Sequence, residues 1–210
     1  PISIHWPGAA TESSEVLATI RHLKRAELGL EDGHRFLLGV DRLDYTKGII
    51  ERFEAVERLL EKHPEWIGRL CLLQIAAPSR SLLNDYQEFA QRVRDCAARI
   101  NQRFAAAACP PIDLRIEQHG HDAVVDYYRA CDVCMVTSLH DGMNLVAKEF
   151  VAARDDEAGV LILSQFAGAA GELREALVIN PYDREETADA LYRALVMAPG
   201  EQRERMRSMR

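Results

Sequence analysis

The 210-residue sequence predicts an α/β fold in which helices cover both faces of a mostly parallel sheet, a doubly wound, Rossmann-like arrangement. Two observations support this prediction. Short, continuous apolar runs, such as RFLLGV at 35–40 and LCLLQIAA at 70–77, are typical of strands buried on both faces. Longer segments between the runs, such as 48–62, carry apolar residues at helical spacing. Strands and helices that alternate in this way form a parallel sheet.

The elements follow in chain order. Strands are expected at residues 35–40, 70–77, 113–117, 133–137, 160–164 and 177–180. Helices are expected at residues 11–28, 48–62, 82–104, 122–130, 143–154, 169–175, 185–197 and 201–210. Ser13 or Ser14 is a suitable cap for the first helix. Pro64 ends the second helix, and Pro110 with Pro111 interrupts the chain after the third.

Composition and charge exclude several classes of protein. The net charge of −7 argues against nucleic acid as the main partner. No apolar run approaches the ~20 residues of a membrane span, and no signal peptide is visible. The chain opens at Pro1 rather than Met, so we expect residues to precede it. The five cysteines are odd in number and scattered, which favours reduced thiols and a cytoplasmic protein. Cys131 and Cys134 form a C-x-x-C pair, but no second ligand pair at zinc spacing follows.

Ligands bind doubly wound sheets beyond the carboxyl ends of the strands. The residues directly after each predicted strand are therefore candidates for a ligand-binding rim. They lie in five loops, at 41–47, 78–80, 119–121, 138–141 and 165–168. Together these loops bring two arginines, one lysine, several histidines and an acid to one edge of the sheet.

Two cations follow the first strand. Arg42 and Lys47 lie just before the next helix, where a pair of cations can neutralise a diphosphate. The alternative is that they form ordinary ion pairs with Asp41 or Asp44. Arg80 follows the second strand, and it belongs either to the same rim or to the solvent-exposed surface.

The stretch 140–149, HDGMNLVAKE, joins a strand to a helix through a glycine turn, and the free amides of such a helix start form an anion site. Asp141 can hold sugar hydroxyls through charge-assisted hydrogen bonds, or it can cap the helix. Glu149 can bind a ribose diol, or it can pair with Lys148 or Arg154. An anion site with two acids suggests a nucleotide sugar as ligand.

Other motifs are weak or missing. His119 and His121 form an H-x-H pair, which we interpret as one rim histidine and one helix-start residue rather than a metal site. The sequence contains neither G-x-x-x-x-G-K-[ST] nor G-x-G-x-x-G, which disfavours a P-loop kinase and a standard nicotinamide dehydrogenase. A G-x-S-x-G nucleophile elbow is also missing.

Five blocks of the sequence together resemble the trehalose-6-phosphate synthase family. They are VDRLDYTKG at 40–48, QIAAPSR at 74–80, DGMNLVAKE at 141–149, LSQFAGA at 163–169 and VINPYD at 178–183. The resemblance implies one half of a GT-B glycosyltransferase, the C-terminal domain that binds the nucleotide sugar. The implied reaction is retaining transfer of glucose from a nucleoside diphosphate glucose, with UDP-glucose favoured, to glucose 6-phosphate, giving trehalose 6-phosphate. The resemblance implies no metal and no further cofactor.

The resemblance also implies roles for individual residues. Arg42, Lys47 and Asp141 are the expected catalytic residues: the two cations hold the leaving diphosphate, and the acid binds hydroxyls of the donor glucose. Further donor contacts are expected from His119, Gly142, Met143, Asn144, Leu145 and Glu149. Of these, Glu149 takes the ribose hydroxyls. Arg80 is expected to reach the acceptor phosphate.

Some positions depart from the family's pattern. Gly120 stands where the family usually has an aromatic residue, His140 where it has Arg, and Ser138 where it has Pro. The donor base and the acceptor therefore stay open. The alternatives are a related glucosyltransferase with another acceptor, of the glucosylglycerol-phosphate synthase type, and a non-catalytic nucleotide-sugar-binding module.

The resemblance also divides the chain. We expect residues 1–30 to form a linker and leading helix, 31–198 the Rossmann-like donor-binding domain, and 199–210 a truncated C-terminal helix. The partners expected are small-molecule substrates and a missing N-terminal GT-B domain, with no nucleic acid and no membrane. Without that domain we expect no turnover, and apolar surface at the lost interface would allow a homo-oligomer.

Overall fold

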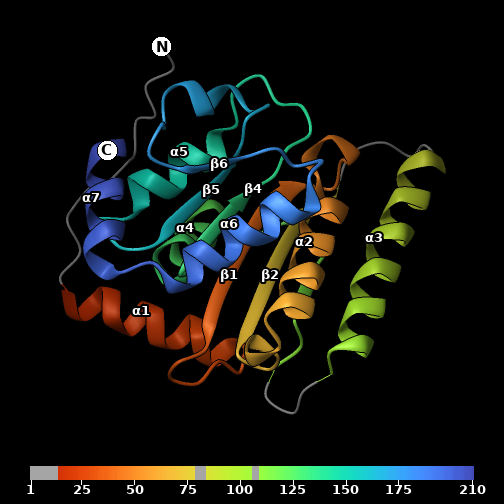
Figure 1. Cartoon of the computed structure of the whole chain (residues 1–210), viewed down its shortest axis with the longest axis horizontal. Helices are drawn as coiled ribbons and strands as arrows, with labels where there is room; N and C mark the ends of the chain where they lie inside the picture. Colours follow the sequence, from red (N-terminus) through yellow and green to blue (C-terminus); the bar gives the residue numbers. More distant parts are fainter. Residues whose placement is uncertain (1–13, 79–83, 106–108) are drawn as a thin grey trace.

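A parallel sheet forms the centre of the computed structural model, which describes residues 14–78, 84–105 and 109–210 (Figure 1). Its six strands within these ranges are β1 (Arg35–Arg42), β2 (Leu70–Ala77), β3 (Ile112–Arg115), β4 (Val133–Val136), β5 (Val160–Ser164) and β6 (Leu177–Ile179). They are ordered β3-β2-β1-β4-β5-β6, and all neighbours pair in parallel. This is the doubly wound Rossmann order, so the predicted fold class is confirmed.

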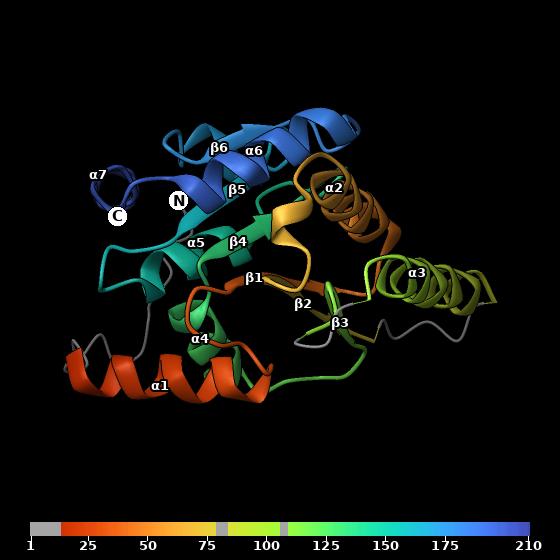
Figure 2. The same cartoon turned by 60° about the horizontal axis from the view of Figure 1, so that its bottom comes forward.

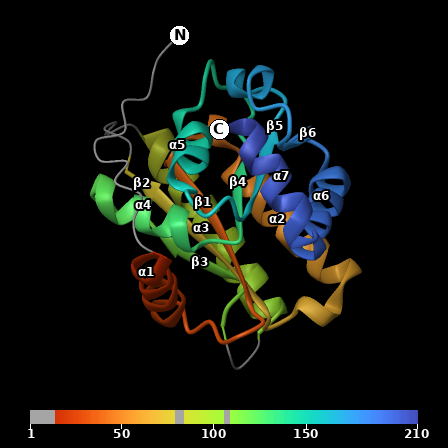
Figure 3. The same cartoon turned by 90° about the vertical axis from the view of Figure 1, so that its left-hand side faces the viewer.

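Helices cover both faces of this sheet (Figures 2 and 3). One face packs against α1 (Ser14–Glu27), α4 (His121–Ala130), α5 (Leu145–Ala153) and α7 (Pro199–Met209). The other face packs against α2 (Ile49–Lys62), α3 (Asn84–Arg103) and α6 (Arg184–Val196). The strand order reverses between β1 and β4, so the connections after these two neighbours diverge to opposite faces. A crevice at such a switch point is where doubly wound domains hold ligands.

Helix α2 illustrates how the sequence pattern produces the core. Its apolar stripe includes Ile49, Phe53, Val56 and Leu59, and each of these side chains is fully buried against the sheet and α6. Helical periodicity places them on one face. Truncating Phe53 to alanine would cost on the order of 3–5 kcal/mol, because the surroundings cannot collapse fully into the cavity.

The predicted elements are present with end shifts of a few residues, with one exception. The predicted helix at 169–175 is wrong: the segment forms a short 3-10 helix, η3 (Gly168–Gly171), followed by turns. The amide of Ala169 donates to the carbonyl oxygen of Met143, and a Cβ at Gly168 would overlap the carbonyl of Gly142. Tertiary contacts with the loop before α5 therefore take precedence over a regular helix here. The expected cap at Ser13 lies outside the described residues. No described helix has the length and apolar character needed to span a membrane.

Candidate functional site

A pocket of about 420 Å³ lies at the switch point, where β1 and β2 end and α5 begins. It is lined by Val40, Asp41, Arg42, Lys47, Ala77, Asp141, Met143, Asn144, Leu145 and Val146. Six of these, namely Arg42, Lys47, Asp141, Met143, Asn144 and Leu145, are residues that the sequence predicted for the site. The parallel order explains the convergence, because the carboxyl ends of neighbouring strands meet at one edge of the sheet.

Lys47 and Asp141 form the centre of this pocket. Lys47 Nζ lies 2.6 Å from Asp141 Oδ2, and about 15% of each side chain is exposed. Burial opposes ionisation of Asp141, but the Lys47 ammonium, the Met143 amide and the Asn144 side chain together hold the pKa of Asp141 below its usual value. Asp141 is therefore a carboxylate at neutral pH, and a positive charge lies directly beside it.

The start of α5 is shaped by both Asp141 and Asn144. Asp141 Oδ1 accepts hydrogen bonds from the amides of Met143 and Asn144, at 3.3 and 3.1 Å. The N-cap is Asn144, whose Oδ1 accepts from the Ala147 amide at 3.2 Å. The sequence-based alternative that Asp141 caps the helix is therefore wrong in detail: Asp141 holds the turn that precedes the cap. Leu145 lines the pocket in the first helical turn, where amides lack intrahelical acceptors.

The Arg42 side chain is more exposed than that of Lys47, and it is held less tightly by its neighbours. Its side chain is 63% exposed, and its Nη2 lies 3.7 Å from Asp44 Oδ2, a weak surface pair. Asp44 is itself engaged as the cap of η1 (Tyr45–Lys47), accepting from the Thr46 amide at 2.9 Å. The alternative expectation was that both cations pair with Asp41 or Asp44. Arg42 does pair with Asp44, whereas Lys47 pairs with Asp141 instead. Arg42 can turn toward a ligand at little cost, whereas Lys47 is already held in place.

Other predicted site residues lie apart from this pocket. Within the described part of the chain, Glu149 lies outside the lining and accepts a hydrogen bond from the Tyr128 hydroxyl at 3.2 Å. His119 also lies outside it, with Nε2 3.1 Å from Glu117 and its ring edge-on to Tyr127. Gly142 lies in the exposed turn against Gly168.

Arg80 falls in the segment 79–83, outside the described residues.

The cysteine and histidine pairs form no metal centre in the described ranges, where no group of three or more His, Cys, Asp or Glu side chains could hold an ion. His121 is the first residue of α4, as predicted. Cys131 and Cys134 are fully buried free thiols, and burial raises the pKa of Cys131 to about 12. A thiol with such a pKa is a poor nucleophile and a poor metal ligand at neutral pH.

Sequence reasoning missed the polar groups beneath the pocket. Asp41 pairs with Arg52, a residue of α2, at 2.7 Å, and Thr137 belongs to the same buried group. The available signal was that Arg52 occupies the apolar face of α2, next to Phe53 and one turn before Val56. A charged residue on a buried stripe needs partners.

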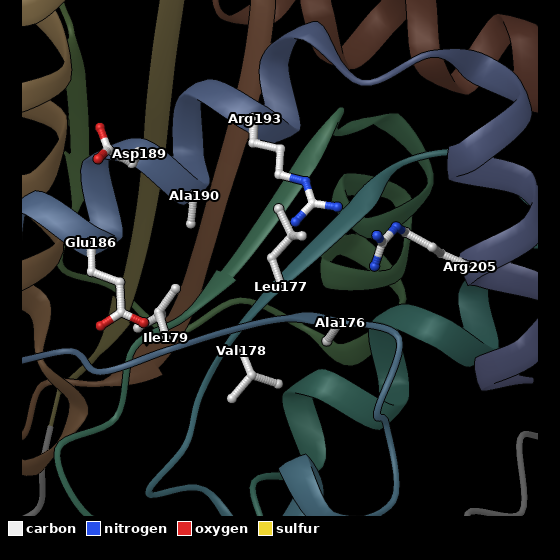
Figure 4. A pocket seen from close by; sticks show the side chains of 9 residues that line it. All are labelled: Ala176, Leu177, Val178, Ile179, Glu186, Asp189, Ala190, Arg193 and Arg205. Atoms are coloured by element: carbon white, nitrogen blue, oxygen red, sulfur yellow. The ribbon is translucent and has the colours of Figure 1, made fainter.

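A second hollow, of about 510 Å³, lies beside the edge strand β6 (Figure 4). Figure 4 shows Glu186, Asp189 and Arg193 projecting from α6 and Arg205 from α7. Arg193 and Arg205 both pair with Glu201, at 3.2 and 2.8 Å. The lining contains none of the predicted site residues, so the switch-point pocket is the candidate ligand site.

The chain is similar to known glycosyltransferases in sequence and in fold. The model of glycosyltransferase family 20 matches residues 1–210. A UDP-forming α,α-trehalose-phosphate synthase of Pichia angusta is 41% identical over 187 residues, covering 89% of this chain and 39% of that protein. A UDP-forming trehalose-phosphate synthase structure from Burkholderia xenovorans has a TM-score of 0.85 at 42% identity, covering 92% of this chain and 45% of that one. A structure described as trehalose-6-phosphate from E. coli bound with UDP-2-fluoro glucose has a TM-score of 0.85 at 41% identity, covering 93% and 45%.

The chain spans less than half the length of each of these proteins. The match to the family model nevertheless extends over its whole length. The chain therefore belongs to glycosyltransferase family 20.

Proposed function

We propose that this chain is the nucleotide-sugar-binding half of a retaining glucosyltransferase that moves glucose from UDP-glucose to glucose 6-phosphate, giving trehalose 6-phosphate. The observation that carries the proposal is the contact of Lys47 Nζ with Asp141 Oδ2, 2.6 Å apart, in a pocket that Arg42 also lines. A cation beside an acid suits a ligand whose phosphates and sugar meet at the bond to be broken. The names of the relatives supply the donor and the product class.

In this proposal the cations and the acid bind different parts of the donor. Lys47 and Arg42 hold the diphosphate and stabilise the charge that it gains as it leaves. Asp141 accepts hydrogen bonds from hydroxyls of the glucose, while the amides at the start of α5, around Asn144 and Leu145, meet the phosphates. Lys47 is pre-positioned by Asp141, so little reorganisation is needed when the donor binds.

Bond breaking and bond making occur on one face of the sugar. The acceptor hydroxyl attacks the anomeric carbon from the side on which the diphosphate leaves, which retains the configuration. The bond from that carbon to the diphosphate breaks, and a leaving phosphate oxygen takes the acceptor's proton. Catalysis then consists of positioning and of charge stabilisation by Arg42 and Lys47.

The residues outside the pocket complete the proposed site. Glu149 binds the ribose hydroxyls, His119 lies beside the donor sugar, and Gly142 contributes a backbone contact next to that of Met143, which lines the pocket. Arg80 reaches the acceptor phosphate.

We further propose that a second domain closes over this rim. Residues 1–30 would lead from that domain, 31–198 would form the donor half, and 199–210 would begin a helix returning toward it. Exposed apolar side chains that follow the strands support such an interface: Tyr45 is 66% exposed, Phe166 40% and Tyr182 63%. The isolated chain would then bind donor without turnover, and it would self-associate through this surface.

Titration calorimetry tests the proposal directly. We expect the chain to bind UDP and UDP-glucose more tightly than ADP-glucose or GDP-glucose. Lys47→Met should weaken UDP binding roughly tenfold or more through the lost charge-assisted contact. Lys148→Met is the matched control, because Lys148 is also 15% exposed and pairs with an acid, Glu172, at 2.7 Å.

Equal effects of the two substitutions, or no binding of any nucleotide sugar, would contradict the proposal. A donor-by-acceptor activity matrix on the full-length enzyme then tests glucose 6-phosphate as acceptor against other phosphorylated polyols.

A further inference from the structure

Arg52, a residue of α2, holds a fully buried guanidinium beneath the donor pocket without lining it. Its Nη1 donates to Asp41 Oδ2 at 2.7 Å and also to the side-chain oxygen of Gln74. Its Nε donates to Thr137 Oγ1 at 3.1 Å. Of these three partners, Asp41 lies in β1, Gln74 lies in β2, and Thr137 directly follows β4. One side chain therefore joins three neighbouring strands.

The surrounding sequence makes room for this group. A Cβ at Gly39 would overlap both the Arg52 guanidinium and the Gln74 side-chain oxygen. Gly39 is therefore required by the buried charge and not by the sheet itself, since any residue can adopt its extended backbone.

The contacts of Arg52 continue into the loops of the pocket. Thr137, which accepts from Arg52, donates to the carbonyl oxygen of Gly48 at 3.0 Å. The amide of Leu139 donates to the carbonyl of Thr46 at 2.7 Å. The end of β1 and the loop after it carry the two proposed diphosphate cations, Arg42 and Lys47. That loop is thus fastened to the loop after β4, which carries the proposed sugar-binding acid.

Stability alone does not account for a charge at this place. Taking an arginine and a carboxylate out of water is costly, and well-packed apolar residues of similar volume are often at least as stable as a buried ion pair. The geometry offers another role. A planar guanidinium with several fixed donors can hold groups from different elements at set directions, which a lysine ammonium cannot.

We propose that Arg52 is a positioning residue of the donor site. It fixes the end of β1 and the loop after it, which carry Arg42 and Lys47, against the loop that carries Asp141, so that diphosphate and sugar are bound at the correct separation. This inference rests on the proposed function, because it assumes that the pocket binds a nucleoside diphosphate sugar.

The first test compares two buried arginines. Arg52→Lys keeps the charge but loses simultaneous contact with Asp41, Gln74 and Thr137. Arg154→Lys is the control, because Arg154 is also fully buried and bonded to backbone carbonyls, those of Tyr128 and Cys131, away from the pocket. Both variants should lower Tm. At a temperature well below either Tm, we expect Arg52→Lys to weaken UDP binding roughly tenfold, and Arg154→Lys to leave it within about twofold.

Two substitutions at Thr137 test the same positioning role with a smaller risk that the variant fails to fold. Thr137→Val removes the hydroxyl that links Arg52 to Gly48, and Thr137→Ser restores it. Thr187→Val is the control, because Thr187, in α6, is similarly buried and its hydroxyl donates to the carbonyl of Asp183, the N-cap of that helix, at 2.9 Å. We expect weaker UDP binding for Thr137→Val only, with recovery in Thr137→Ser.

The outcomes separate this inference from the proposed function. Equal affinity losses in Arg52→Lys and Arg154→Lys, or unchanged affinity in both Arg52→Lys and Thr137→Val, would overturn the positioning role while leaving the donor site intact. If the unaltered chain binds neither UDP nor UDP-glucose, the proposed function fails, and this inference fails with it.

Discussion

The ammonium of Lys47 and the carboxylate of Asp141 lie 2.6 Å apart although the two residues are 94 positions apart in the chain. Each follows one of the two strands between which the sheet order reverses, β1 and β4. The contact therefore exists only because these strands are neighbours, and it links the proposed phosphate-binding and sugar-binding parts of the site.

Replacing Asp141 by Asn should separate the two parts experimentally. We expect Asp141→Asn to weaken binding of UDP-glucose more than binding of UDP, because the acid is proposed to contact the glucose and not the nucleotide. The dissociation constant of UDP-glucose divided by that of UDP, both measured by calorimetry, should rise about tenfold. Asp183→Asn serves as control, since Asn caps α6 as well as Asp does. An equal loss for both ligands would assign Asp141 to the diphosphate side.

The same ion pair predicts a pH dependence of stability. The folded-state pKa of Asp141 lies below its ordinary value of 3.8, so the pair's contribution is present above that value and is lost as pH falls through the folded pKa. The difference in Tm between the unaltered chain and Asp141→Asn should therefore stay constant from about pH 5 to pH 8. It should shrink below about pH 4. A difference that grew on acidification would show that the carboxylate destabilises the fold.

Tyr128 provides a test of the proposed ribose contact. Its buried hydroxyl donates to Glu149 Oε2 at 3.2 Å, which orients the carboxylate. We expect Tyr128→Phe to weaken UDP binding a few-fold, roughly the effect of one hydrogen bond. The loss should be smaller for 2′-deoxy-UDP, because that ligand lacks one of the proposed partners of Glu149.

The neighbouring residue supplies the control. Tyr127 also loses one hydroxyl when replaced by Phe, but that hydroxyl donates to Glu27 of α1 at 2.7 Å. Tyr127→Phe should leave UDP affinity unchanged. A loss of the same size in both variants would mean that general destabilisation, not the orientation of Glu149, weakens binding.

Two glycines allow backbone strain to be separated from steric overlap. Gly48 and Gly33 both have positive φ, 64° and 87°. A Cβ at Gly48 would overlap the Thr137 carbonyl, whereas a Cβ at Gly33 meets open space. Gly33→Ala should cost about 1–2 kcal/mol through strain alone. Gly48→Ala should cost more and should also abolish UDP binding, since the two loops would be forced apart. Urea unfolding and calorimetry check both effects; comparable unfolding free energies would refute the overlap argument.

The sequence was sufficient to predict the sheet and much of the site for a single physical reason. Apolar runs mark buried strands, and the residues after parallel strands share one edge, so Arg42, Lys47 and Asp141 could be assigned to a common rim. Strand order is a tertiary property that no local pattern contains, and therefore the pairing of Lys47 with Asp141 could not be foreseen. The same holds for Arg52, whose partners come from three strands, and for Gly168, where contact with the loop before α5 replaced the expected helix.

The adjacency of β1 and β4 also bears on how the domain acquires its binding capacity. Their pairing closes a long intervening segment that contains β2 and β3, and long-range closures of this kind form slowly compared with local helices. Arg42 and Lys47 alone, on an isolated β1–α2 unit, have no acid opposite them. We therefore expect the proposed nucleotide binding to develop together with the complete sheet. Ligand added during refolding would then detect the formation of the native topology rather than of any single element.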